Sequence, residues 1–172
     1  MEATATWVED QYADNVNDNR QYLRYGQLKR PSTPLDAFLP LSSAHYGNWI
    51  FFERLSEAYG PDVVRRMWEQ ADSAPGAPDL YSIQAVARII RHEGTKLREF
   101  YADFAAGNVD PKHVYEEGSA YPKTRPKASA TLSPKRRDVS YLKELDHLTS
   151  ATYQLKPGSS LGNAWRLKIA GK

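Results

Sequence analysis

The residues with the clearest chemical potential stand in the first ten positions of the chain, MEATATWVED. In a helix, offsets of four and seven residues return to nearly the same angle, so Glu2, Thr6 and Glu9 would lie on one face. Ala3 and Trp7 would lie on another face and pack inward. Carboxylates that border a pocket can bind a metal ion or transfer protons. The alternative is a solvated acidic face near a helix N-terminus, where the macrodipole favours negative charge.

A family resemblance gives this segment a more specific interpretation. EATATWVE, residues 2–9, resembles the helix that carries the third zinc ligand in gluzincin-type zinc metallopeptidases. In that class a His-Glu-x-x-His helix provides two zinc ligands and the general base, and a second helix of the form Glu-(Gly/Ala)-x-Ala-x-Trp/Tyr-x-Glu provides the third. Glu2 matches the ligand glutamate, and Glu9 matches an acid that would hydrogen-bond a ligand histidine. The resemblance implies a zinc-dependent peptidase whose substrate is a peptide or protein.

The resemblance extends over nearly the whole chain. DNVNDN at residues 14–19, YGNWIF at 46–51 and YEEG at 115–118 are similar, in this order, to segments of a family of secreted bacterial metalloproteases. A histidine and a tyrosine are the usual donors to the oxyanion in gluzincin sites, so His45 and Tyr46 become candidate catalytic residues. The alternative for this pair is a capping or partly buried position. The family implies an extracellular protein, although no signal peptide is visible at the start of the chain.

The chain departs from the family pattern because it contains no His-Glu-x-x-His. The nearest string is HEGTK at residues 92–96, where Lys96 replaces the second histidine and Gly94 breaks the helix. A catalytic zinc needs about three protein ligands, and this chain offers one at the matched place. We therefore expect a fragment or truncated relative of a zinc metallopeptidase that is inactive alone. The N-terminal catalytic segment, with the two histidine ligands, would have to come from residues not present here.

A second function class stays open beside the peptidase. In this alternative the chain is a non-catalytic helical module for protein interaction, and Glu2 is only an acid at the start of a helix. The net charge of +2 does not favour nucleic acid as a partner, and no apolar run is long enough for a membrane span. The absence of cysteine excludes disulfides and thiolate metal sites. The Asp- and Asn-rich residues 14–19 do not fit an EF-hand loop, because Val16 stands at its third position.

The hydrophobic periodicity predicts a mainly α protein. Apolar residues recur at helical spacing in about five segments, so we expect a helical bundle over residues 1–118. After the opening helix, the expected helices begin near residues 42, 61, 82 and 95 and end near residues 59, 71, 93 and 107.

The composition changes after residue 118. Residues 119–140 carry Lys and Arg among Pro, Ser, Thr and Ala, which predicts a flexible basic linker. In residues 141–172 two segments, 151–155 and 165–169, alternate apolar and polar residues around a turn at 156–160. This pattern predicts a small partial β hairpin. Since two strands are rarely stable alone, we expect the start of a β domain whose remainder is absent.

Overall fold

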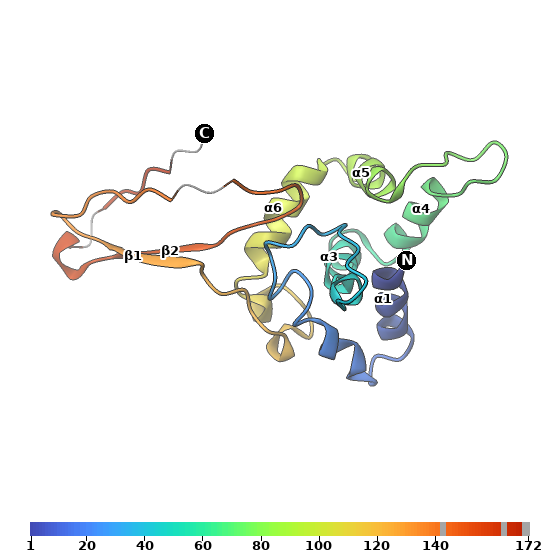
Figure 1. Cartoon of the computed structure of the whole chain (residues 1–172), viewed down its shortest axis with the longest axis horizontal. Coiled ribbons are helices and arrows are strands. Elements are labelled where there is room, and N and C mark those ends of the chain that lie inside the picture. Colours follow the sequence, from blue (N-terminus) through green and yellow to red (C-terminus); the bar gives the residue numbers. More distant parts are fainter. Residues whose placement is uncertain (142–143, 163–164, 170–172) are drawn as a thin grey trace.

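The computed structural model describes residues 1–141, 144–162 and 165–169, and it confirms the mainly α class (Figure 1). The α-helices are α1 (Glu2–Tyr12), α2 (Ala44–Gly47), α3 (Trp49–Tyr59), α4 (Asp62–Gln70), α5 (Ser82–His92) and α6 (Leu97–Gly107). Short 3₁₀ turns are η1 (Asn17–Tyr22), η2 (Pro111–His113), η3 (Gly118–Ala120) and η4 (Ser159–Leu161). None of the described helices is long and apolar enough to cross a membrane.

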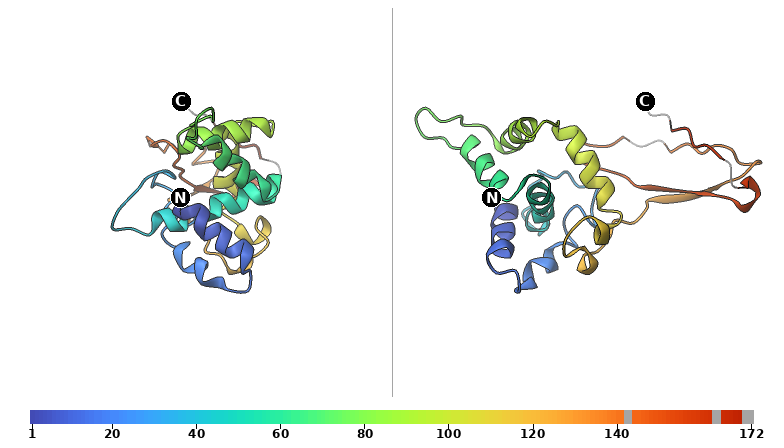
Figure 2. Two further views of the ribbon diagram at one scale, coloured as in Figure 1. Left: turned by 90° about the vertical axis from the view of Figure 1, so that its right-hand side faces the viewer. Right: turned by 180° about the vertical axis from the view of Figure 1, so that it is seen from behind.

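Helix α3 lies at the centre of the helical body, with α1, α4, α5 and α6 around it (Figures 1 and 2). Its residues Trp49, Ile50 and Phe51 are all 0% exposed, so the helix is apolar on several sides. Phe51 packs edge-on against Phe100 and Phe104 of α6 at ring-centroid distances of 5.6 and 5.3 Å. The core therefore surrounds α3, and the other helices are positioned by their contacts with it.

The helix expected from residue 42 to residue 59 is divided into α2 and α3 at Asn48. The Asn48 side chain accepts a hydrogen bond from the Gln27 backbone N–H at 3.2 Å and donates one to the Leu35 carbonyl at 2.8 Å. Helix α2 also lies directly against the preceding chain, because a Cβ on Gly47 would stand 2.3 Å from the carbonyl oxygen of Tyr22. This close approach needs glycine and fixes α2 against η1.

Helix α1 is joined to α3 by a buried carboxyl group. Glu53 is 8% exposed, and its Oε2 accepts hydrogen bonds from Trp7 Nε1 at 3.0 Å and Gln11 Nε2 at 3.3 Å. Burial raises the pKa of Glu53 to about 7, and the nearby charges of Glu57 and Asp10 raise it further. The predicted inward position of Trp7 is confirmed, but the buried acid that holds it is a finding of the structure.

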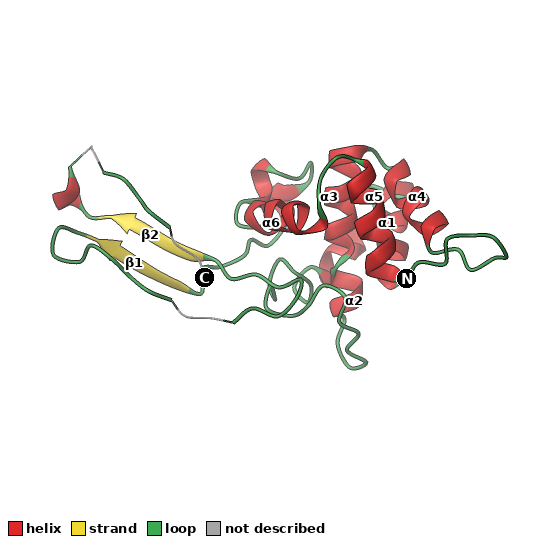
Figure 3. Cartoon of the chain, turned by 90° about the horizontal axis from the view of Figure 1, so that it is seen from above, coloured by secondary structure: helices red, strands yellow, loops and turns green. Residues whose placement is uncertain are grey.

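The β part differs from the expected linker and hairpin. Strand β1 (Ala128–Leu132) falls inside the predicted flexible linker and pairs with β2 (Tyr153–Pro157), and the two strands are parallel from Ala128↔Tyr153 to Leu132↔Pro157. Residues 165–169 form no strand, and Trp165 is 47% exposed. Strands β1 and β2, with the described residues 133–141, 158–162 and 165–169, form an arm that projects from the helices (Figure 3).

The difference arises because the two strands that pair lie far apart in the sequence. Residues 133–141 leave the end of β1, and residues 144–152 lead from the helical body into β2, so the strands run in the same direction (Figure 1). A local alternation of apolar and polar residues indicates a strand but does not identify its partner. The helical body also continues past the predicted boundary at residue 118. Tyr121 is 7% exposed and lies in the core, and Thr124 Oγ1 donates to the Leu28 carbonyl.

We expect Glu53→Gln to remove a pH dependence of stability. The native state holds this proton more tightly than the unfolded chain, since the pKa rises from 4.5 to about 7 on folding. The contribution of Glu53 to stability is therefore greatest below pH 4.5 and decreases as the pH rises to about 7. The full pKa shift corresponds to on the order of 3 kcal/mol in the free energy of unfolding. Urea unfolding of the wild type and of Glu53→Gln between pH 4 and 8 measures this difference.

The expected result is a variant that matches the wild type near pH 4.5 and exceeds it above pH 7, because glutamine keeps an oxygen that can accept from Trp7. Glu69→Gln, on the exposed side of α4, is the control and should keep the wild-type pH dependence. Parallel curves for wild type and Glu53→Gln would contradict a buried, protonated Glu53.

Candidate functional site

The structure brings the candidate residues of α1 and α2 together at one edge of the helical body. Glu2 is half-buried on the first turn of α1, and Tyr46 is half-buried on α2. The negative charge of Glu2 is the largest cause that raises the pKa of Tyr46, followed by partial desolvation of the phenol. A carboxylate and a phenol from two separate elements therefore lie close together, which the sequence spacing could not establish.

Glu9 lies farther along the same side of α1. It is exposed, and its charge makes a smaller contribution to the raised pKa of Tyr46. Thr6, which lies between the two acids in sequence, is buried, and its Oγ1 donates to the Glu2 carbonyl at 3.0 Å. The ring of Tyr46 is also held by Tyr22 of η1, which stacks on it with ring centroids 5.1 Å apart.

His45 occupies the space next to Tyr46. Its ring lies 4.5 Å from the ring of Tyr46 and 5.2 Å from that of Phe38. The Nδ1 atom of His45 is buried and has no hydrogen-bond partner among the described residues. A buried ring nitrogen without a partner is uncommon, because it keeps the desolvation cost without a compensating bond.

A cavity of ≈ 340 Å³ opens beside Glu2 and His45, and we call it the Glu2 cavity. Its apolar wall comes from the start of the chain with α1, the loop before α2, helix α3 and helix α5. These residues are Met1, Ala3, Leu35, Ala37, Phe38, Phe51, Phe52, Ile83 and Val86. Its polar lining is Glu2, Asp36, His45, Asn48 and Ser82. Tyr46 and Glu9 do not line this cavity, whereas Glu2 both lines it and lies near Tyr46.

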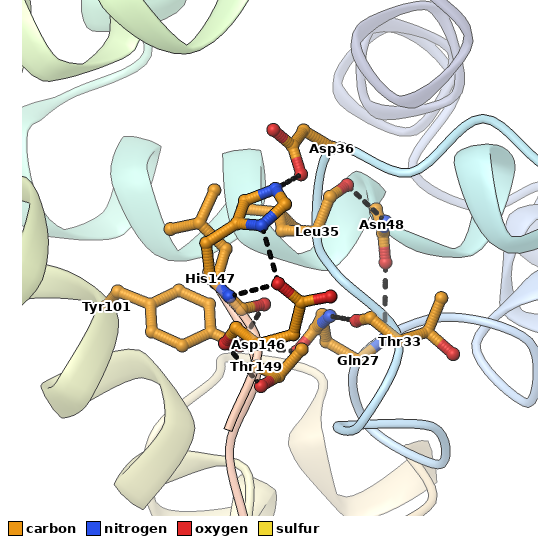
Figure 4. Close-up of polar contacts among 10 residues, drawn as sticks. Gln27, Thr33, Leu35, Asp36, Asn48, Tyr101, Asp146, His147 and Thr149 are labelled. Atoms are coloured by element: carbon orange, nitrogen blue, oxygen red, sulfur yellow. Dashed lines mark hydrogen bonds and ion pairs between the residues drawn. The ribbon is translucent and has the colours of Figure 1, made fainter. Parts of the chain in front are cut away.

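The loop that carries Leu35 and Asp36 is held by residues 146–150, which we call the docking segment (Figure 4). Its backbone is paired in both directions, since Leu35 N–H donates to the Leu148 carbonyl at 3.1 Å and Ser150 N–H donates to the Pro31 carbonyl at 2.7 Å. His147 Nε2 lies 2.8 Å from Asp36 Oδ1.

The side chain of His147 in the docking segment adds ionic contacts to this backbone pairing. Hydrogen bonds with Asp146 and then Asp36 raise the pKa of His147, which favours the imidazolium. An imidazolium bound to Asp36 neutralises a carboxylate that borders the Glu2 cavity. The base of the arm therefore helps to set the charge of the cavity wall.

Two residues of this region carry features that the sequence did not indicate. Leu148 has φ of 47°, a left-handed conformation that is strained for a branched side chain. Its carbonyl oxygen lies 2.7 Å from the hydroxyl of Tyr101, which also lies 2.8 Å from Gln27 Oε1. Tyr101 is 7% exposed, and burial raises its pKa. The sequence could not indicate that the hydroxyl of Tyr101 joins the docking segment to Gln27.

The described residues do not by themselves form a zinc site. They include no group of three or more His, Cys, Asp or Glu side chains that could hold a metal ion. Glu2 is one carboxylate, and a catalytic zinc needs about three protein ligands.

Comparisons with known proteins give no family for this chain. It matches no protein-family model, no curated protein and no solved structure. The gluzincin resemblance therefore depends on the sequence segments and on the geometry of the residues that they contain.

We expect Glu2→Gln to lower the pKa of Tyr46, because it removes the charge that most disfavours the phenolate. Glu9→Gln should lower it by less, since Glu9 makes the smaller contribution. Ring-carbon NMR of labelled tyrosines, with the Tyr46 signal assigned from Tyr46→Phe, measures both effects. An unchanged titration in Glu2→Gln would show that the two side chains are apart in solution.

We expect Tyr101→Phe to destabilise the pairing between the docking segment and the loop that carries Leu35 and Asp36. The substitution removes the hydroxyl that joins Leu148 to Gln27, and a buried carbonyl left unpaired costs about 1–3 kcal/mol. Amide hydrogen exchange should become faster at Leu35 and Ser150, which pair the loop with the docking segment. The control is Tyr59→Phe, which removes a hydroxyl without a hydrogen bond to the rest of the described chain. Equal exchange in the two variants would contradict this role.

Proposed function

We propose that this chain forms one wall of the active site of a zinc metallopeptidase. Glu2 would provide the third zinc ligand, and Glu9 would hydrogen-bond a ligand histidine. Tyr46 or His45 would donate a hydrogen bond to the oxyanion of the substrate. The two histidine ligands and the general base would come from a His-Glu-x-x-His helix outside this chain, so the chain is inactive alone. Zinc would supply the activated water and polarise the peptide carbonyl.

The observation that carries this proposal is the proximity of Glu2 on α1 to Tyr46 on α2, which raises the pKa of Tyr46. The segment that resembles the third-ligand helix is helical, and its first glutamate meets the candidate oxyanion donor from another element. The stacking of Tyr22 on Tyr46 and the contact of Phe38 with His45 hold both candidate donors in place. Rings held from both sides favour a fixed orientation toward a substrate.

The alternative, a non-catalytic module for protein interaction, has support from the arm. Exposed apolar residues on it include Trp165, Leu167 and Ile169, and β1 and β2 form a sheet of only two strands. Parallel strands normally lie in larger sheets that are covered on both faces. On this alternative the extracellular partner would bind the arm, and Glu2 would have no role in binding.

The test is to recover the native protein from cells and medium with an antibody against residues 115–121, and to measure its bound zinc and peptide hydrolysis. We expect a product larger than 19.5 kDa that contains zinc and a His-Glu-x-x-His helix. In that protein Glu2→Gln should abolish zinc binding and hydrolysis, and Glu9→Gln should weaken zinc binding by about 10- to 100-fold.

Glu69→Gln is the matched control, because it removes an exposed carboxylate from α4, away from the Glu2 cavity. It should keep both zinc and activity. A native protein without zinc, or one that keeps its zinc and activity in Glu2→Gln, would overturn the proposal and favour the interaction module.

A further inference from the structure

We propose that the arm binds the phosphate backbone of double-stranded DNA through one exposed face of its two strands. The near-balanced charge of the chain is the sum of two opposite parts. Residues 1–122 contain 12 Lys and Arg against 18 Asp and Glu, whereas residues 123–172 contain 11 against 3. The net charge is therefore −6 for the first part and +8 for the second. The total of +2 gave no reason to expect nucleic acid as a partner, but a separate basic region is the usual electrostatic signature of one.

One face of the two-stranded sheet is polar, and we call it the polar face. Successive side chains of a strand point to opposite faces, and paired residues of neighbouring strands share a face. The register therefore places four exposed residues on the polar face: Ser129, Thr131, Gln154 and Lys156. Ser129 Oγ lies 3.4 Å from Gln154 Oε1, which confirms that these two side chains lie on the same side. The polar face presents hydroxyl, amide and ammonium donors and contains no carboxylate, so it suits an anionic ligand.

The opposite face of the sheet is apolar and already covered. Ala130 is 4% exposed, and Leu155 is half-buried. Tyr153, on this same face, stacks on Tyr141 with ring centroids 4.5 Å apart and an interplanar angle of 19°. The polar face is therefore the side of the strands that is open to a ligand, and it has no aromatic ring on which an unpaired base could stack. This arrangement favours a duplex over a single strand.

Further cations flank the polar face at both ends of β1. Arg125 and Lys127 stand directly before the strand, and Lys135, Arg136 and Arg137 follow it. All five side chains are exposed, and none forms an ion pair with another described residue. A DNA duplex carries one negative charge per about 1.7 Å of its axis, so cations spread along the arm can meet phosphates at several positions.

The shape of the arm also fits a duplex. Paired strands lie about 4.8 Å apart, and a ribbon of two strands can enter the major groove of B-form DNA, which is about 12 Å wide. The arm projects from the helices, so a duplex can contact it without meeting the acidic helical body (Figure 3). Lys, Arg, Ser, Thr and Gln side chains are common donors to phosphate oxygens, and such contacts carry no sequence information. The inferred binding is therefore independent of base sequence.

Two other anionic partners match the polar face less well. A membrane surface would need apolar side chains that enter the lipid beside the cations, and the polar face has none. The acidic body of a second copy is already partly neutralised by its own ion pairs. Arg65 pairs with Asp62 and Glu69, and Arg66 pairs with Glu93. Duplex DNA, whose phosphates have only mobile counterions to release, is the better electrostatic counterpart.

The test is the affinity of the whole chain for a labelled duplex of mixed sequence, measured by fluorescence anisotropy as the salt concentration rises from about 0.05 to 0.2 M. The Kd should increase steeply with salt, because each phosphate contact adds about 0.9 to the slope of log K against log salt. A combined Lys135→Gln, Arg136→Gln and Arg137→Gln variant should bind at least about tenfold more weakly, with a slope smaller by about 2 to 3. Circular dichroism checks that this variant, altered only at exposed positions, keeps its helices.

The matched control removes three exposed cations from the helical body, in a combined Arg88→Gln, Arg91→Gln and Lys112→Gln variant. It changes the net charge by the same amount and should bind like the wild type, because charges more than about 10 Å from the duplex are screened at 0.1 M salt. Thr131→Glu tests the polar face directly, since it places a carboxylate opposite Lys156. It should weaken binding by more than about tenfold, whereas Thr131→Val, which keeps the shape of the side chain, should have a much smaller effect.

No binding of the duplex at about 0.05 M salt, or an equal loss of affinity in the arm and body variants, would overturn the inference. Tighter binding of a single strand than of the duplex would contradict it, because that preference indicates base stacking. Binding of phosphatidylglycerol vesicles without binding of the duplex would assign the arm to a membrane surface instead. Self-association that is lost in the arm variant, again without duplex binding, would assign it to a second copy. These outcomes are separate from the proposed peptidase, which is tested by zinc and hydrolysis in the native protein.

Discussion

The contact between α1 and α3 is the constraint on which the rest of the site depends. Trp7 and Gln11 both donate to one oxygen of Glu53, whose side chain is buried between the two helices. A buried carboxyl group is costly unless it is protonated or hydrogen-bonded, and Glu53 is both over the acidic part of the pH range. This contact fixes the orientation of α1 and its position along α3. It therefore determines where Glu2 lies relative to α2 and the Glu2 cavity.

A second constraint acts on α2. The short helix is pressed against η1 at Gly47, where no side chain could be accommodated, and Asn48 turns the chain sharply into α3. His45 and Tyr46 are therefore presented toward α1 rather than along the surface. Since α2 has only four residues, its position follows from these contacts and not from its own helical stability.

The arm is hydrogen-bonded to the candidate site, whereas a flexible linker would make no such contacts. The docking segment pairs with the loop that lines the Glu2 cavity, and strained Leu148 accepts from Tyr101 at the same point. Strain of this kind persists only where the surrounding contacts determine the conformation. A conformational change in the arm would therefore be transmitted, through Leu148 and His147, to the loop that carries Leu35 and Asp36.

The sequence by itself determined the helices and several of the residues that face their core. Trp7 was correctly placed inside, because helical spacing puts it on the same inward face of its helix as Ala3. The sequence also selected Glu2, Glu9, His45 and Tyr46 as candidates, although only by resemblance. Tertiary structure alone decided that Glu2 meets Tyr46, that β1 pairs in parallel with β2, and that Asp36 binds His147. These contacts join residues far apart in the chain, and local periodicity carries no information about which distant segments pack together.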